Sequence, residues 1–193
     1  MLTYLTHRMN KRMRDKSPSK AGHAIATAFC AVTIFTASCL PVSASATSAW
    51  QAWPAIGDAS LTWGPWVIYD SELRSPSGTF RSQDQDLALV IKYQRDIDKD
   101  DLIEATDDQW RHLGISRAKR DKWLRTLEQI WPDVKKGDRL IYVLQQEQGR
   151  FYRDNRQIGV LNDKEMSQSF MHIWLSPNTS YPTIRQQLIG MKK

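Results

Sequence analysis

The chain divides near residue 46 into two parts of different composition, and this division constrains the fold more than any other feature. Residues 1–46 hold both cysteines and six Lys and Arg residues against one acid. A basic segment, a largely apolar stretch over residues 21–40 and Ala44-Ser45-Ala46 follow one another there, which is the pattern of a cleaved secretory signal peptide. We therefore expect residues 1–46 to direct export and residues 47–193 to form a single domain outside the cytoplasm, as in a periplasm.

Two other fates of the first segment stay open. About 20 apolar residues can just span a bilayer, so the segment could remain as an anchor, although His23 and Thr33 make it weakly hydrophobic. Thr36-Ala37-Ser38-Cys39 also approaches the cleavage box of a lipoprotein, but Thr36 stands where a branched apolar residue is expected. The pattern favours cleavage over both alternatives.

Removal of residues 1–46 changes the charge and the chemistry of what remains. The whole chain has 27 Lys and Arg against 21 Asp and Glu, so the remaining domain has 21 against 20, or +1. The basic surface that nucleic-acid binding requires is therefore missing. Cys30 and Cys39 leave with the first segment, so the domain has no disulfide, thiol nucleophile or thiolate metal site.

All eight tryptophans lie beyond residue 46. A tryptophan buries a large area and needs only one hydrogen-bond partner, so this load predicts a packed aromatic core rather than a surface that stacks ligands. We expect Trp174 inside that core and Trp50, near the start of the domain, at its periphery.

The periodicity of apolar residues alternates between strand and helix. Strands are predicted where apolar and polar residues alternate or where a short apolar run lies between turn residues: residues 60–73 as a bent pair broken at Gly64-Pro65, then 87–93, 139–146, 150–153 and 157–161. Helices are predicted where apolar residues recur every three or four positions: 102–113, 123–131, 166–174 and 182–189. Strands and helix pairs joined by tight turns indicate an α+β fold with an antiparallel meander.

Catalytic and metal-binding motifs are scarce. The sequence has no nucleophile elbow, phosphate loop, dinucleotide fingerprint or H-E-x-x-H motif. His112 and His172 stand alone on separate predicted helices, where a satisfied surface or core histidine is the ordinary interpretation. The acidic run over residues 96–108 lacks the glycine and the terminal glutamate of a calcium loop, so we expect it to open a helix. The basic residues of 117–125 would then be solvated or pair with that helix. No cofactor and no metal are expected.

Several blocks of sequence resemble the exported bacterial branch of the chalcone isomerase-like family. They are Tyr93-Gln94-Arg95-Asp96-Ile97, residues 131–138 (WPDVKKGD), residues 170–176 (FMHIWLS) and residues 184–190 (IRQQLIG). The resemblance covers about residues 55–190. It implies an open-faced β-sandwich, in which a large antiparallel sheet and a layer of helices enclose a cleft that holds a flavonoid or a fatty acid in relatives.

The same resemblance argues against the family's isomerase reaction. The plant enzymes hold an enolate oxygen through a threonine, a tyrosine and an arginine. Their threonine corresponds to Tyr69 and their arginine falls near Ala59 and Ser60, so neither residue type is kept and the oxyanion would lack its donors. A small hydroxyl residue of the cleft does correspond to Ser167.

We therefore expect a non-enzymatic domain that binds a hydrophobic or amphipathic small molecule in the cleft, with Tyr69, Tyr93, Arg95, Ser167 and Trp174 as its binding residues. Such pockets are apolar with a few placed polar groups, and a guanidinium can meet a carboxylate. Arg95 can equally pair with an acid of the following helix.

Two other functions remain open. The domain could be a protein-interaction module of the cell envelope that uses Trp50 and Trp53 as surface anchors. It could also be an isomerase or lyase with rearranged residues, in which case a buried pair of groups with shifted pKa values should be present.

Overall fold

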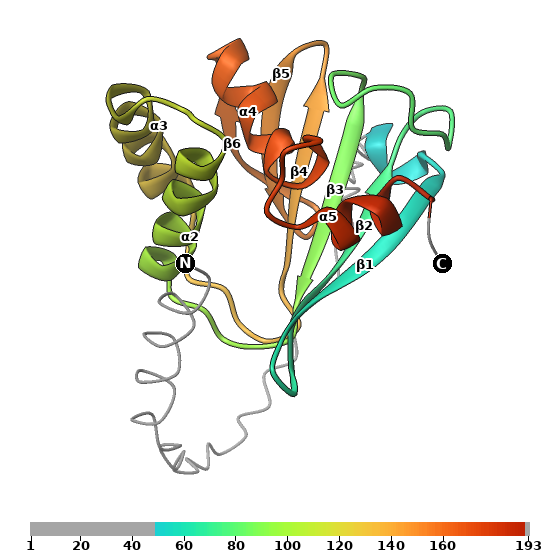
Figure 1. Ribbon diagram of the computed structural model, residues 1–193, viewed down its shortest axis with the longest axis horizontal. Helices are drawn as coiled ribbons and strands as arrows, with labels where there is room; N and C mark the ends of the chain where they lie inside the picture. The colour runs from blue at the N-terminus through green and yellow to red at the C-terminus, as the bar shows by residue number, and fades with distance from the viewer. Residues whose placement is uncertain (1–48, 192–193) are drawn as a thin grey trace, which may run out of the picture. The chain divides into compact units, whose positions relative to one another are not determined.

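The computed structural model describes residues 49–191, so the predicted signal peptide lies outside the described residues. The described chain forms six strands and four α-helices, preceded by a 3-10 turn (Figure 1). In chain order they are η1 (Ala49–Ala52), β1 (Ala55–Trp63), β2 (Trp66–Arg74), β3 (Leu87–Tyr93), α2 (Lys99–His112), α3 (Arg117–Ile130), β4 (Arg139–Gln145), β5 (Gln148–Arg153), β6 (Arg156–Leu161), α4 (Lys164–Leu175) and α5 (Pro182–Leu188).

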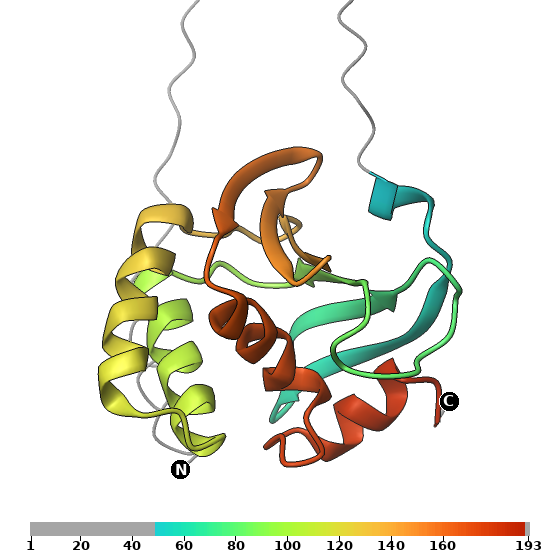
Figure 2. The ribbon, with the colours of Figure 1, turned by 90° about the horizontal axis from the view of Figure 1, so that it is seen from above.

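The strands form one antiparallel sheet in which sequence neighbours are also spatial neighbours, in the order β1 to β6. Helices α4 and α5 lie on one side of this sheet, and η1 lies on the other (Figure 2). Helices α2 and α3 pack against each other, and α2 also contacts α4. This arrangement confirms the predicted α+β fold, an open antiparallel sheet with a helical layer.

The core between the sheet and the helices is aromatic. Phe170 of α4 lies at its centre, with ring centroids 4.5 Å from Tyr142, 5.0 Å from Phe151 and 5.4 Å from Trp174. These pairs are edge-on, an arrangement that aromatic rings prefer over face-to-face stacking. Trp174 is buried, as expected.

Two glycines let the layers approach closely. A Cβ atom on Gly57 of β1 would overlap the carbonyl oxygens of Gln187 and Leu188, and one on Gly149 of β5 would overlap the Tyr142 hydroxyl. Helix α5 therefore lies closer to β1, and the Tyr142 ring of β4 lies closer to β5, than a larger residue at these positions would permit.

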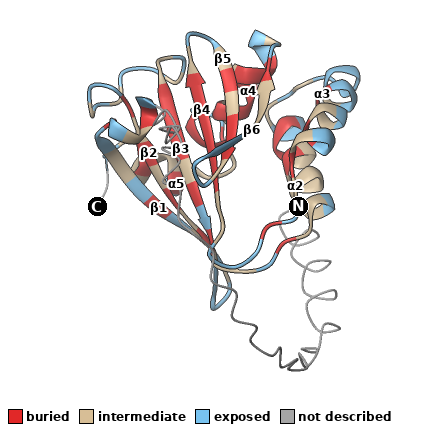
Figure 3. Cartoon of the chain, turned by 180° about the vertical axis from the view of Figure 1, so that it is seen from behind, coloured by how far each residue is buried: buried red, intermediate tan, exposed pale blue. Residues whose placement is uncertain are grey.

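The second face of the sheet is covered near η1, which corrects the expectation for Trp50 and Trp53. These side chains are only 5% and 9% exposed and pack on a patch formed by Ala88, Ile141, Val143 and Tyr152. The central strands β3 and β4 are buried on both faces (Figure 3). The apolar residues of β3 and β4 that face away from α4 need to be shielded from water, and Trp50 and Trp53 pack over them. Because both tryptophans are buried in this way, neither can serve as a surface anchor.

The acidic and basic runs lie on the two helices of the α2–α3 hairpin. Asp100 and Asp101 occupy the first turn of α2, as the helix dipole favours. Arg120 of α3 donates to Asp107 of α2 at 2.6 Å, so one member of the basic run pairs with the helix before it. Lys119 and Lys122 pair instead with Glu165 and Asp163 at the start of α4. No group of three metal-ligating side chains occurs in residues 49–191, and no helix in that range is long and apolar enough to cross a membrane.

Candidate functional site

Three of the predicted binding residues meet between the sheet and α4. The register of β2 and β3 sets Tyr69 opposite Tyr93, and the two rings are 6.1 Å apart. Trp174, on the sheet-facing stripe of α4, donates its indole N–H to the Tyr69 hydroxyl at 2.9 Å. We call Tyr69, Tyr93 and Trp174 the tyrosine cluster.

Both tyrosines of the cluster are held in the neutral form. Burial raises the pKa of Tyr93 and of Tyr69 well above the usual range, and the Trp174 donor offsets only part of the effect on Tyr69. The neighbouring Tyr181 adds to the rise in the pKa of Tyr69. Neutral phenols donate hydrogen bonds but cannot act as bases at physiological pH.

The two hydroxyls of the cluster differ in their hydrogen bonding. The Tyr69 hydroxyl accepts from Trp174 at 2.9 Å, so it can still donate its own proton. The Tyr93 side chain is 5% exposed. Its hydroxyl is not among the fully buried side-chain atoms of residues 49–191 that lack a hydrogen-bond partner, which are the indole nitrogens of Trp50 and Trp131.

Further polar groups join α2 to the start of α5 beside this cluster. Gln109 is buried on α2 and donates to the Tyr181 hydroxyl at 3.2 Å, while Ser180 donates to Gln109 at 2.5 Å. Burial raises the pKa of Tyr181 as well. The tyrosine cluster is therefore bordered by the neutral hydrogen-bonding groups of Gln109, Ser180 and Tyr181, and the Asp108 carboxylate is close enough to raise the pKa of Tyr181 further.

Ser167 does not join the cluster. It is fully buried near the start of α4, where its hydroxyl donates to the Asp163 carbonyl at 2.9 Å and accepts from the Gly149 N–H at 3.1 Å. Tyr142 donates to the Ser167 carbonyl at 2.7 Å. These bonds tie α4 to β4 and β5 and occupy the hydroxyl.

Arg95 lies just beyond the end of β3, and its guanidinium carbon sits 5.5 Å from the centre of the Trp66 ring. This distance is within the range of a cation–π contact. Trp66 begins β2, at the tip of the β1–β2 hairpin. The structure therefore places Arg95 against an exposed aromatic residue.

The positions that correspond to the plant catalytic residues hold no oxyanion donors of the plant type. Ala59 is buried and accepts a hydrogen bond from Ser71 through its carbonyl. Ser60 is exposed and donates to Asp70 at 2.6 Å. The threonine position holds Tyr69, a phenol whose hydroxyl accepts from Trp174.

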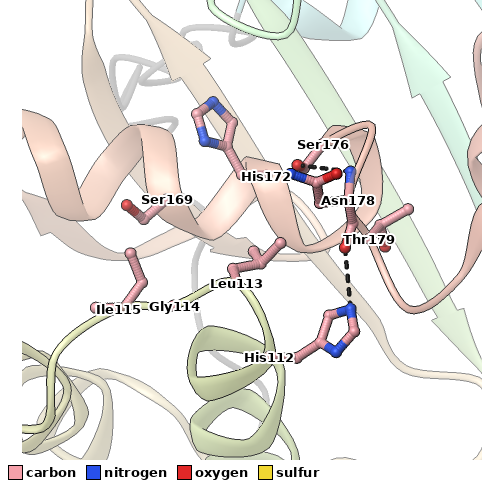
Figure 4. Close-up of a pocket in the computed structure, with 9 residues that line it drawn as sticks. All are labelled: His112, Leu113, Gly114, Ile115, Ser169, His172, Ser176, Asn178 and Thr179. Carbon is pink, nitrogen blue, oxygen red and sulfur yellow. Dashed lines mark hydrogen bonds between the residues drawn. The ribbon is translucent and has the colours of Figure 1, made fainter.

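A surface pocket of about 530 Å³ lies between the end of α2 and helix α4 (Figure 4). His112 donates to or accepts from the Asn178 carbonyl at 2.9 Å, and His172 contacts the Asp84 carboxylate at 3.1 Å. Ser169, whose carbonyl accepts from Trp110, also lines it. None of the five predicted binding residues lines this pocket.

The pocket was missed because its parts are far apart in the sequence. His112 ends α2 and His172 lies in the last turn of α4, and each looks isolated when it is considered alone. The sequence signal that could have brought the two histidines together is the pair of apolar stripes on α2 and α4. Trp110 and Phe170 lie on these stripes, and their rings pack 6.5 Å apart.

Comparison with known proteins agrees with this architecture. Residues 69–190 match the model of a family described as chalcone isomerase-like. An uncharacterized protein of Haemophilus influenzae is 28% identical over 141 residues, which cover 73% of this chain and 70% of that protein. The crystal structure of the Arabidopsis thaliana fatty-acid binding protein AtFAP1 superposes with a TM-score of 0.52 at 6% identity, covering 70% of this chain and 86% of that one. The chain belongs to the chalcone isomerase-like family.

Proposed function

We propose that residues 47–193 form an exported, non-enzymatic domain that binds a hydrophobic or amphipathic small molecule of the fatty-acid type, with its polar head at the tyrosine cluster. The fold is shared with AtFAP1, a fatty-acid binding protein. Helices α4 and α5 and the sheet supply apolar surroundings for a chain. Tyr69 and Tyr93 supply donors for a carboxylate.

The observation that carries this proposal is the pairing of Tyr69 and Tyr93 under α4. Both side chains are buried, their rings lie 6.1 Å apart and burial keeps both phenols neutral by raising their pKa values. Two neutral phenols in apolar surroundings can donate to the oxygens of a carboxylate, which an apolar ligand would not need.

Binding fits the cluster better than turnover does. A base is needed to remove a proton, and burial keeps both phenols protonated. The alternative of a rearranged isomerase predicted a buried pair of groups with shifted pKa values, and Tyr69 and Tyr93 are such a pair. Both of their pKa values are raised, so each phenol can donate a proton in a hydrogen bond but neither can remove one. Donors with no base beside them support recognition of a ligand.

Export is the second part of the proposal and rests on the sequence of residues 1–46 alone. The protein recovered from its native cells should begin at or near Thr47 and should lie outside the cytoplasm. N-terminal sequencing tests this. A start at Met1 in a membrane fraction would mean a retained anchor, and a lipid on Cys39 would mean a lipoprotein.

The binding test is a titration with oleate followed by the melting temperature and by calorimetry. Oleate should stabilise the domain, by about 2.7 kcal/mol when its free concentration is about 100 times its dissociation constant. Tyr93→Phe removes only the hydroxyl, so it should weaken binding about tenfold or more, the value of a hydrogen bond to a charged group.

Tyr152→Phe is the matched control, because Tyr152 is equally buried but packs on Trp50 on the other face of the sheet. It should leave oleate affinity unchanged. An affinity that both variants lower equally, or no stabilisation of the parent protein by oleate, would contradict the proposal.

A further inference from the structure

The tip of the β1–β2 hairpin presents apolar side chains to solvent. Trp66 is 42% exposed and Val67 is 39% exposed, and apart from Met191 they are the only exposed large apolar residues in 49–191. Trp63 stacks on Trp66 with ring centroids 5.4 Å apart. Gly64 has a positive φ of 54°, which fits the tight two-residue turn between the strands.

This tip lies at a basic end of the sheet. The strand register brings four segments to that end, namely residues 62–67, 92–96, 135–139 and 153–156. They contain seven Lys and Arg residues against three Asp residues, so their net charge is seven minus three, or +4. The rest of residues 47–193 is therefore net acidic, since that whole segment carries only +1.

The acids at this end are already paired. Asp96 contacts Lys135 at 3.3 Å, Asp138 contacts Arg153 at 2.6 Å and Asp154 contacts Arg139 at 3.1 Å. Lys136 and Arg156 are both exposed, and they keep the surface positive around the tip.

We propose that this end of the sheet, which we call the hairpin surface, docks on an anionic lipid bilayer. Tryptophan prefers the interface between headgroups and acyl chains because its ring is apolar and its N–H is polar. Basic residues around it are attracted to anionic headgroups by roughly 1 kcal/mol each. The stacked Trp63 and Trp66 rings would enter the interface, and the surrounding charges would lie on the headgroups.

Charge and position favour a bilayer over a protein partner. The apolar part is limited to two rings and one valine, which is little for the core of a stable protein interface, whereas the +4 charge complements an extended anionic surface. The hairpin surface lies near the tyrosine cluster along two strands, since Tyr69 follows Trp66 by three residues on β2 and Tyr93 precedes Arg95 by two. An amphiphile taken from the bilayer would have a short distance to travel to the cluster, and in that respect the inference rests on the proposed function.

The test is co-sedimentation of the protein, as purified from its producing cells, with vesicles of phosphatidylcholine alone or mixed with phosphatidylglycerol. Binding should require phosphatidylglycerol and should be lost at about 1 M salt, where charges are screened beyond about 3 Å. Acyl chains labelled with bromine should quench part of the tryptophan fluorescence. Trp66→Ser should reduce that quenching to the part that comes from Trp63 and weaken binding at least about tenfold.

A pair of charge variants separates the hairpin surface from a general effect of charge. Lys136→Glu with Arg156→Glu should weaken binding at least about tenfold, since each basic residue contributes about fivefold. Arg117→Glu with Arg125→Glu makes the same change of charge on exposed positions of α3 and should have little effect. Three results would overturn the inference: equal losses of binding in both pairs of variants, equal binding to neutral vesicles, or binding that Trp66→Ser leaves intact. The last result would leave Trp66 as a contact for another protein.

Oleate binding without vesicles, measured in the same variants, keeps the two proposals apart. Trp66→Ser and the Lys136/Arg156 variant should retain oleate affinity. Vesicle binding without any oleate affinity would refute the proposed ligand and leave the docking surface standing, whereas oleate affinity without vesicle binding would refute the docking alone.

Discussion

Replacement of Trp174 with alanine should lower the free energy of unfolding by about 3–5 kcal/mol, the usual cost of emptying a buried aromatic position. The side chain is buried, packs edge-on against Phe170 at 5.4 Å and donates to Tyr69 at 2.9 Å. Most of the cost should come from lost packing and the cavity, because a neutral hydrogen bond contributes only about 1 kcal/mol net.

A double-mutant cycle can isolate that hydrogen bond. Trp174→Phe keeps an aromatic ring against Phe170 but removes the indole N–H, and Tyr69→Phe removes the acceptor. If the two groups interact as the 2.9 Å distance indicates, the double variant should lose less stability than the sum of the single losses, by about 0.5–1.5 kcal/mol.

Urea unfolding followed by far-ultraviolet circular dichroism is the suitable assay, because tryptophan fluorescence changes with the substitution itself. The variants should shift the midpoint without changing the slope of the transition. A loss below about 1 kcal/mol for Trp174→Ala, or additive losses in the cycle, would show that Trp174 is not packed and bonded as described.

Three further changes test other parts of the structure. Trp50→Ala should lower the free energy of unfolding in urea by about 3 kcal/mol, because Trp50 covers the second face of the sheet. Trp66→Ala at the exposed hairpin tip should lower it by under about 1 kcal/mol, and equal losses would contradict the burial pattern. Asp163→Ala removes the side-chain acceptor of the first turn of α4 and should cost about 1 kcal/mol, with Asp163→Asn largely restoring it in the same assay. The pKa values of Tyr69 and Tyr93 are higher in the folded than in the unfolded chain, so their contribution to the free energy of unfolding is complete below about pH 10 and is lost as the pH rises further. The urea midpoint should therefore fall above that pH. A midpoint that rises there would refute the assigned burial.

The regular elements were predictable because their signals are local. The run 87–93 was predicted as a strand and is β3 with the same limits, and its apolar character on both faces matches its burial. The stripe on α4 and its stop before Pro177 likewise place that helix correctly. Glycine and proline at the β1–β2 turn marked where the first strand pair bends.

Features that depend on what covers an element were not predictable in this way. Periodicity shows that β3 and β4 are apolar on both faces, but it does not say which segment covers the second face, so Trp50 and Trp53 were expected at the surface. The tyrosine cluster follows from strand register and the α4 stripe, whereas the separation of Ser167 and Arg95 from it depends on three-dimensional packing.

Native mass spectrometry of the protein purified gently from its own cell envelope tests the central proposal most directly. We predict a species heavier than the polypeptide by the mass of one amphiphile, which is released on denaturation and identified as a fatty acid or a related lipid. The same preparation of Tyr93→Phe should carry much less of it, and Tyr152→Phe should carry as much as the parent. A folded parent protein that is always recovered at its bare polypeptide mass, and that binds no added oleate, would contradict the assignment of the tyrosine cluster as a lipid-binding site.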